Sequence, residues 1–317
     1  MHKYNSPLVD SVLAKLVKAR YLTQTEFLET FFYNDIQVKE LIQEASFVIK
    51  NEPNVLKLEA PINIFGDVNG GFFNVLRFFD LCGYPPHSKF LFLGNLVDAT
   101  SESIYLLLLL LTLKLNFPDC IYLLRGVKET TTVLEHLEFA TYCANFKPTN
   151  DPTELFDMIT DLFEVLPVAA IINEKVFCAH SGINPSYDFF TKLHAIQRPI
   201  TITIPDEGPV TDLLWAKPNE QDYGWVKSPS DISYVYGADV IAEFLLYHRF
   251  QFICRGNSFF PRGFKLEAMG QIVSLCSAPN YQGSQNYGAV MILQADLSYK
   301  MQLLEISDPP SPESENT

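Results

Sequence analysis

The stretch PINIFGDVNG, residues 61–70, is a short apolar run that ends in a polar, glycine-containing turn. The same pattern returns in KFLFLGN at 89–95, in IYLLRG at 121–126 and in KVFCAHSG at 175–182. Each apolar run has four or five residues, which is the length of a buried strand. The segments between the runs are long enough for helices, so the pattern predicts a layered α/β fold. Polar residues just past the strand ends should then converge on one edge of the sheet, where such folds place their sites.

Helical spacing precedes this region, and a more β-rich part follows it. One apolar stripe consists of Val9, Val12, Leu13, Leu16 and Val17. Residues 36–47 suggest a second helix, which ends before the breaker Asn51-Glu52-Pro53-Asn54. Further strand candidates are residues 251–254, 272–276 and 289–293. The tail at 308–317 is polar, acidic and Pro-rich, so we expect it to be disordered.

Composition excludes several classes of partner. The chain has 317 residues, 48% of them hydrophobic, which is enough to bury a large core. Its net charge is -14 and no two Lys or Arg residues are adjacent, so an electrostatic grip on nucleic acid or on an anionic membrane is not expected. The apolar run Ile104–Leu113 is shorter than the roughly 20 residues that span a bilayer, and it predicts a buried helix.

The cysteines and the N-terminus bear on the compartment. Six cysteines are scattered without a CxxC motif, which favours reduced, buried thiols; they are residues 82, 120, 143, 178, 254 and 276. The first residues lack the basic-then-apolar pattern of a signal peptide, so we do not expect export.

At the strand ends the sequence resembles the phosphoprotein phosphatases that cleave phosphoserine and phosphothreonine, and it is most similar to the type-one catalytic subunit. The family's motifs, in order, are GDxHG, GDxVDRG, RGNHE, HGG, RAHQ and SAPNY. This chain has GDVNG (66–70), GNLVDAT (94–100), RGVKE (125–129), HSG (180–182), RGNS (255–258) and SAPNY (277–281) in the same order. The resemblance extends to about residue 306.

The resemblance implies an α/β fold of the metallophosphoesterase type, a layered β-sandwich flanked by helices with a helical N-terminal lead-in. We expect one phosphatase-like domain over residues 1–307. The lead-in would cover 1–59 and the sandwich core 60–307, followed by the disordered tail.

The family uses two divalent metals, such as manganese, iron or zinc, which activate a water and clamp the phosphate. The positions that match its ligands are Asp67, Asn69, Asn95, Val127, His180 and Asn257. Only Asp67 and His180 keep the family's residue type. Asn95 replaces the bridging aspartate with a neutral amide, and the Val127 side chain cannot ligate a metal. We therefore expect no bound metal cofactor.

The remaining catalytic positions are also altered. Lys128 stands where the resemblance places the general-acid histidine, and a lysine near its ordinary pKa donates a proton poorly at neutral pH. Asp98 and Tyr281 are kept. Arg125 remains of the phosphate-gripping arginines, whereas Ala99 and Ser230 replace the others. Arg125 is equally compatible with pairing to a carboxylate such as Glu129.

Lys128 suggests a hypothesis beyond simple loss of function. If the fold is kept, it would lie near Asp67 and Asp98. Its ammonium could then replace the missing metal charge as an internal surrogate cation.

Type-one phosphatases also bind regulators through an apolar groove remote from the metals. The matching positions are Val176, Phe252, Leu266, Leu297, Tyr299 and Met301. These side chains suit a partner-binding groove, and they equally suit ordinary packing between strands.

Three functions remain open. The first is a pseudophosphatase, a catalytically impaired homologue that binds regulatory or phosphorylated protein partners. The second is a weak or altered metal-dependent phosphatase in which one ion is held by Asp67, Asn69, Asn95 and His180. The third is a phosphoprotein reader that binds phosphate through Arg125 and Lys128. The resemblance implies a cytoplasmic or nuclear location.

Overall fold

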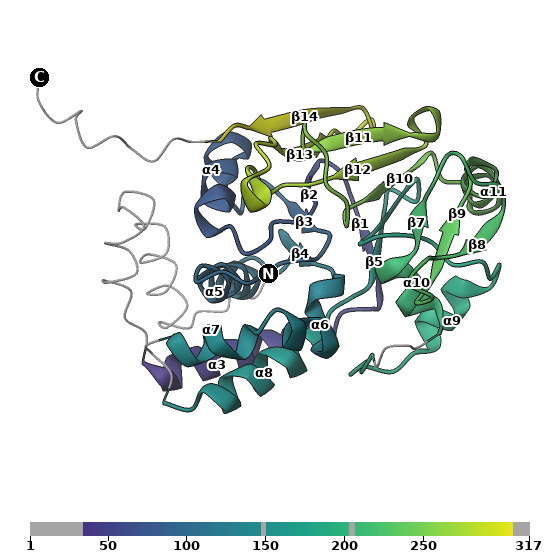
Figure 1. Cartoon of the computed structure of the whole chain (residues 1–317). Coiled ribbons are helices and arrows are strands. Elements are labelled where there is room, and N and C mark those ends of the chain that lie inside the picture. The colour runs from purple at the N-terminus through teal and green to yellow at the C-terminus, as the bar shows by residue number, and fades with distance from the viewer. Residues whose placement is uncertain (1–33, 147–149, 203–206, 307–317) are drawn as a thin grey trace, which may run out of the picture.

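The computed structural model describes residues 34–146, 150–202 and 207–306, which form two facing β-sheets with helices on both outer sides (Figure 1). Both sheets mix parallel and antiparallel strands. One has the order β1 (Val55–Leu58), β5 (Ala169–Ile172), β6 (Val176–Ala179), β10 (Phe252–Arg255), β12 (Ile272–Leu275), β11 (Phe264–Glu267). The other has the order β14 (Tyr299–Leu304), β13 (Gly288–Leu293), β2 (Ile62–Phe65), β3 (Phe90–Phe92), β4 (Ile121–Leu123). The predicted α/β sandwich is confirmed.

A small three-stranded sheet lies apart from the sandwich. Its order is β7 (Lys217–Pro218), β9 (Tyr234–Tyr236), β8 (Trp225–Lys227). Short 3₁₀ helices are η2 (Val127–Glu129), η3 (Ala268–Gly270) and η4 (Tyr281–Gly283).

The helices divide between the two outer faces (Figure 1). The five-stranded sheet is covered by α3 (Asp35–Lys50), α4 (Phe72–Cys82), α5 (Ser103–Asn116) and α8 (Pro152–Glu164), with α6 (Thr131–His136) and α7 (Phe139–Asn145) beside them. The six-stranded sheet is covered by α9 (Phe189–Ala195), α10 (Pro209–Trp215) and α11 (Ala238–His248). The order of layers is therefore helix, sheet, sheet, helix.

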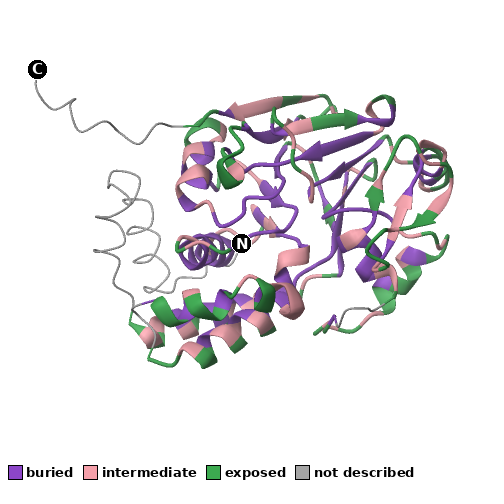
Figure 2. Cartoon of the chain, viewed as in Figure 1, coloured by how far each residue is buried: buried purple, intermediate pink, exposed green. Residues whose placement is uncertain are grey.

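Three apolar clusters hold these layers together. Alternation along each strand sends one set of side chains between the sheets, as with Ile64 and Leu91, and the other set under the helices, as with Phe65 and Phe92. The third cluster joins the six-stranded sheet to its helices and centres on Phe177. The inner strands of the two large sheets are buried, whereas the edge strands β11 and β14 and the small sheet are partly exposed (Figure 2).

Helix α3 confirms the helix predicted from residues 36–47. The Asn34 side chain accepts a hydrogen bond from the Gln37 backbone N–H at 2.9 Å, and the Gln37 side chain accepts one from the Asn34 N–H at 3.3 Å. This reciprocal cap satisfies two amides of the first turn. The stripe from Val9 to Val17 lies outside the described residues, as does the tail at 308–317.

The boundary of the lead-in was wrong in one respect. Residues 55–58 are not helical but form β1, which pairs in parallel with β5 in the six-stranded sheet. Helical periodicity stops at Asn51, and the four residues of β1 are buried except for Lys57.

Helix α5 is the buried helix predicted from the run Ile104–Leu113. Its residues from Ser103 to Leu115 are all buried. Among the described residues, no helix combines the length and apolar character needed to cross a membrane.

The cysteines are free, as predicted. Four are buried, whereas Cys82 and Cys120 are only partly buried, so the prediction of burial was too broad. Burial raises the pKa of the Cys143 thiol to about 12, which makes it unreactive at neutral pH.

Candidate functional site

The polar residues that follow the strands meet at one edge of the sandwich, as predicted. Asp67 follows β2, Asn95 follows β3 and Asn257 follows β10. Asn95 Nδ2 donates to Asp67 Oδ2 at 2.7 Å, and the Asn257 backbone N–H donates to Asp67 Oδ1 at 2.8 Å. The Asp67 carboxylate is therefore the centre of this site, and hydrogen-bond donors occupy both of its oxygens.

The orientation of the Asn95 amide is set by its neighbour. Its Oδ1 accepts the backbone N–H of Lys128 at 3.0 Å, so its Nδ2 must face Asp67. A bridging metal ligand would present an oxygen at this place. Here an NH₂ group points at the carboxylate, where it supplies part of the positive electrostatic potential that a cation would provide.

The three asparagines at ligand positions share a backbone feature. Asn69, Asn95 and Asn257 have φ values of 48°, 52° and 50°. Asparagine tolerates this left-handed region better than most residues. The Asn257 side chain donates to Ser181 Oγ and to the Leu214 carbonyl, both at 3.1 Å, so its amide nitrogen supports the backbone around β6 and α10.

Val127 begins the 3₁₀ helix η2, and its aliphatic side chain offers no donor atom to a metal. Its backbone carbonyl accepts the Thr130 hydroxyl at 2.7 Å, which holds the turn that carries Lys128. The position that the resemblance matches to a metal ligand is therefore structural here.

His180 is fully buried and neutral. Its Nδ1 lies 2.8 Å from the Leu93 carbonyl, which can only accept, so Nδ1 carries the hydrogen. Burial lowers the pKa of His180 to about 4. Its Nε2 has no hydrogen-bond partner within the described part of the chain. This is the tautomer that a metal-ligating histidine adopts, and it is the feature of the site that suits a metal best.

Lys128 forms the second half of the site. Its Nζ donates to Asp98 Oδ2 at 2.6 Å, to Asn69 Oδ1 at 2.7 Å and to the Tyr281 hydroxyl at 3.1 Å. Burial lowers the pKa of Lys128, but the charge and hydrogen bond of Asp98, with Tyr281, outweigh it and the pKa is raised. The ammonium therefore stays charged at neutral pH, and all three of its N–H groups are used.

The surrogate-cation hypothesis places Lys128 near Asp67 and Asp98. Lys128 pairs with Asp98, as predicted. Within the described residues Lys128 has no direct bond to Asp67, but Asn95 links the two: it bonds Asp67 through Nδ2 and the Lys128 backbone through Oδ1. The Asn95 amide therefore binds the Asp67 carboxylate, and the Lys128 ammonium binds the Asp98 carboxylate.

Arg125 does not face the site. It is 1% exposed, and its Nε donates to the backbone carbonyl of Glu129 at 2.9 Å while Nη1 donates to the Ile200 carbonyl. Burial lowers its pKa to about 10. Arg125 forms no salt bridge with a carboxylate within the described residues, although the charges of Glu164 and Glu129 partly offset the effect of burial on its pKa. A guanidinium that ties two chain segments together leaves no surface for a ligand.

Sequence reasoning missed the role of the Glu129 carboxylate. It accepts the backbone N–H groups of Asn95 at 2.7 Å and of Leu96 and Gly126 at 2.8 Å, and it is fully buried. It shapes the loop after β3 and so positions Asn95. Its place as the last letter of RGVKE was the only signal.

Arg255 was missed as well. It is 1% exposed and donates to Ser258 Oγ at 2.9 Å and Ser274 Oγ at 3.0 Å, and also to the Ser181 carbonyl. These bonds join the ends of β6, β10 and β12, so Arg255 holds His180 and Asn257 in register. The only sequence signal for Arg255 was its place as the first residue of the RGNS motif.

Comparison with known proteins identifies the scaffold that carries this site. A family model described as calcineurin-like phosphoesterase matches residues 60–257. The chain belongs to the calcineurin-like phosphoesterase family. The match spans all six positions compared with metal ligands, and Asn257 is its last residue.

Solved structures agree with this assignment. The chain is similar to a protein serine/threonine phosphatase from Saccharomyces cerevisiae that itself has similarity to human phosphatase PP5. The two share 27% identity with a TM-score of 0.81, over 94% of this chain and 97% of that one. A cold-active protein-tyrosine phosphatase of a psychrophilic Shewanella shares 13% identity with a TM-score of 0.53, over 81% of this chain and 84% of that one, and supports the fold alone.

The donor set of this calcineurin-like phosphoesterase does not suit two divalent cations. Among the described residues, no group of three or more His, Cys, Asp and Glu side chains is placed to hold a metal ion. The Asp67 carboxylate at the centre of the site is faced by the NH₂ group of Asn95. The Lys128 ammonium donates to the side-chain oxygen of Asn69, another of the ligand positions. Two added cations would meet these donors rather than ligands, and little negative charge would offset them.

A cleft of about 360 Å³ opens beside Lys128. Asp98 and Glu102 line it, and no Lys or Arg does so within the described part of the chain. Ala99 is exposed there, where the resemblance places an arginine. The cleft therefore presents negative charge to a phosphate, and the cation beneath it is already paired.

The six predicted groove positions lie between the two sheets or at their edge. Val176 and Phe252 are buried, and Leu297, Tyr299 and Met301 pack half-buried against the same cluster. The rings of Phe252 and Tyr299 are 5.5 Å apart. Leu266 is 49% exposed on β11 and outside that cluster. Val176 and Phe252 thus serve strand packing, while the other four leave apolar surface at the edge strands β11 and β14.

Proposed function

We propose that this calcineurin-like phosphoesterase is a pseudophosphatase, which acts by binding protein partners and not by hydrolysis. The observation that carries the proposal is the orientation of Asn95, whose NH₂ group faces Asp67 at 2.7 Å where a bridging metal ligand would present an oxygen. Lys128 completes the arrangement at Asp98, Asn69 and Tyr281. The polar groups of the site are largely satisfied by one another, so a metal would have to break bonds to enter.

The chemistry of hydrolysis also lacks its participants. A proton donor for the leaving group should titrate near the working pH, but the pKa of Lys128 is raised above its ordinary value. The family mechanism depends on metals to generate the attacking hydroxide. With a donor set that opposes two cations, this chain offers no substitute for that step.

Elemental analysis tests the proposal directly. The purified full chain is incubated with excess manganese, freed of unbound ion and assayed both for metal and for hydrolysis of a phosphoserine peptide. We expect less than about 0.2 metal per chain and no turnover above a sample treated with chelator, because two-metal hydrolysis needs both ions. One or two tightly held ions together with chelator-sensitive turnover would refute the pseudophosphatase.

A second candidate is a weak phosphatase with a single metal, favoured by the unpartnered Nε2 of His180. The ion would be held by Asp67 and His180, with the Asn69 and Asn95 carbonyl oxygens turned inward. In that case turnover should depend on added metal and disappear in Asp67→Ala. Turnover that survives Asp67→Ala would come from a contaminant.

The phosphoprotein reader loses its main support, because Arg125 is buried and the cleft beside Lys128 is acidic. A pair of peptides that differ only in phosphorylation of one serine is the appropriate probe. We expect them to bind equally or not at all. Tighter binding of the phosphorylated peptide would support the phosphoprotein-reader hypothesis.

For the partner, we propose an extended apolar segment of a regulatory subunit, which would lie along β14. Among the described residues this strand is at the edge of its sheet, so its outer backbone groups can pair with an added strand, and Tyr299, Met301 and Leu297 supply apolar contact. Met301→Glu should weaken capture of a regulatory subunit of type-one phosphatases, while Lys300→Gln, on the neighbouring exposed position, should not. Equal capture by both variants would exclude this groove.

The six free cysteines suit the reducing cytoplasm or nucleus, which we propose as the location of this protein.

A further inference from the structure

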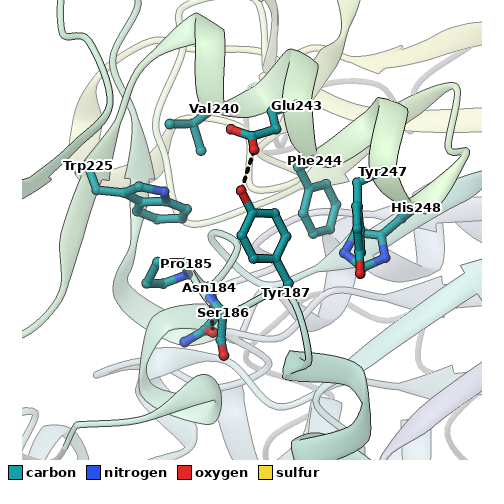
Figure 3. Close-up of a pocket in the computed structure, with 10 residues that line it drawn as sticks. All are labelled: Asn184, Pro185, Ser186, Tyr187, Trp225, Val240, Glu243, Phe244, Tyr247 and His248. Carbon is teal, nitrogen blue, oxygen red and sulfur yellow. Dashed lines mark hydrogen bonds between the residues drawn. The ribbon is translucent and has the colours of Figure 1, made fainter.

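A second pocket, which shares no lining residue with the phosphatase-like site, lies between helix α11 and the segment that follows His180. Half of its lining residues are aromatic, and it is a shallow, open pocket of about 50 Å³. Figure 3 shows the Tyr187 ring below Glu243, with Trp225 on one side and Tyr247 on the other. Nothing in the proposed phosphatase-like chemistry uses these residues.

The pocket has one charged group on its wall. The Glu243 carboxylate accepts a hydrogen bond from the Tyr187 hydroxyl at 2.5 Å. Among the lining residues no Lys or Arg is present, and burial lowers the pKa of His248, which keeps it neutral at pH 7. Lys192, which donates to Ser186 on the pocket wall, is paired with Asp188 at 3.0 Å.

The aromatic rim is more exposed than packing requires. Tyr187 is 62% exposed and Tyr247 is 58% exposed, and their ring centroids are 5.2 Å apart. Leu246, the next residue on α11, is 83% exposed. Exposed apolar side chains gathered around a pocket are typical of a binding surface.

We infer that this pocket binds an arginine side chain carried by an extended segment of a partner protein. The planar guanidinium stacks on aromatic faces and forms paired hydrogen bonds with a carboxylate, and the pocket offers both partners together. The net charge of -14 favours a basic segment in general. A free small cation would leave the exposed Tyr247 ring uncovered, whereas residues that flank an arginine would cover it.

This inference does not depend on the state of the phosphatase-like site. A partner held here would leave both that site and the β14 edge accessible. The three surfaces can therefore be tested separately.

The test uses two pools of hexapeptides that are identical except that the third residue is arginine or its neutral isostere citrulline. Trp225 fluorescence reports binding in a Trp215→Phe background, since these are the two tryptophans of the chain. We expect the arginine pool to bind about fivefold more tightly, because a solvent-exposed cation–π contact and a partly exposed carboxylate each add little. Equal binding of the two pools overturns the inference.

Variants locate the effect. Glu243→Gln should abolish the preference for arginine, whereas Glu135→Gln, an exposed acid on α6, should leave it unchanged. Tyr247→Leu should weaken binding of the arginine pool, and because this residue is 58% exposed the variant should fold. A preference that persists in Glu243→Gln overturns the assignment. Equally tight binding of N-acetylarginine amide alone overturns the peptide partner.

Discussion

Lys128 and Asp98 form a charge pair whose two side chains are 12% and 9% exposed, and each depends on the other. Removal of one partner from a buried pair usually costs about 3–5 kcal/mol, and residual exposure reduces this. We expect Lys128→Ala to lower the free energy of unfolding by roughly 2–3 kcal/mol, measured by chemical denaturation.

The matched control is Lys192→Ala, which breaks a surface pair with Asp188 whose side chains are 51% and 62% exposed. That change should cost less than about 0.5 kcal/mol. The double variant Lys128→Ala/Asp98→Ala should recover part of the loss. Equal stability of Lys128→Ala and the unchanged protein would sink the surrogate-cation hypothesis.

Asn95→Asp tests whether the site can return to the family's residue at one position. The new carboxylate would stand where Nδ2 now lies 2.7 Å from Asp67 Oδ2. We expect a loss of roughly 1–3 kcal/mol of stability at pH 7 in chelator and no gain of phosphatase activity, since Val127, Lys128 and Asn257 remain.

The loss in Asn95→Asp should shrink at pH 5. Two facing carboxylates raise the pKa of one of them in the folded state, so the folded variant binds a proton more tightly than the unfolded chain. Its stability relative to the unchanged protein therefore rises as pH falls. Melting curves at the two pH values check the sign, and measurable phosphatase activity from this variant would show that the damage to the site is smaller than we infer.

At the scale of the element, helix α5 shows how one polar residue is accommodated in an apolar segment. Lys114 is fully buried near its C-terminus, where Nζ donates to the carbonyls of Pro118 at 3.0 Å and Ile121 at 2.9 Å and pairs with Glu52. The lysine thus joins the helix end to the loop before β4 and to the end of α3.

Lys114→Met should therefore destabilise the protein although it makes the helix more apolar. Two buried carbonyls and the Glu52 carboxylate would lose their donor, which predicts a loss of roughly 2–4 kcal/mol. Differential scanning calorimetry should show a lower melting temperature for Lys114→Met than for the control Lys57→Met, an exposed position on β1. A melting temperature equal to that of the control would mean that water replaces the ammonium at little cost.

At the scale of the whole molecule, we expect the stability of the sandwich to be independent of metal. A ligand that binds only the folded state raises stability by RT ln(1 + [L]/Kd), so a filled metal site would raise the melting temperature. We expect the same melting temperature in chelator and in millimolar manganese or zinc, within about 1 °C. A metal-dependent rise of several degrees that is lost in Asp67→Ala would point instead to an ion held by Asp67 and His180.

The order of strands and helices was predictable from the local sequence, because the apolar residues of a buried strand or helix recur at the spacing of that element. The runs at 62–65, 90–92, 121–123 and 176–179 are strands, and the helix over Ile104–Leu113 is buried as predicted. The strand β1 was missed because four residues between breakers carry too little pattern to separate a strand from a loop.

The sequence by itself determined which chemical groups stand at the strand ends, since Asn95, Val127, Lys128 and Asn257 can be read directly in the family's motif order. Only the tertiary structure decided which way those groups face. The bond from the Lys128 backbone turns the Asn95 amide toward Asp67, and the burial of Arg125 removes it from the site. The physical reason is that residue type is local, whereas amide orientation, burial and charge pairing depend on neighbours brought together from distant parts of the chain.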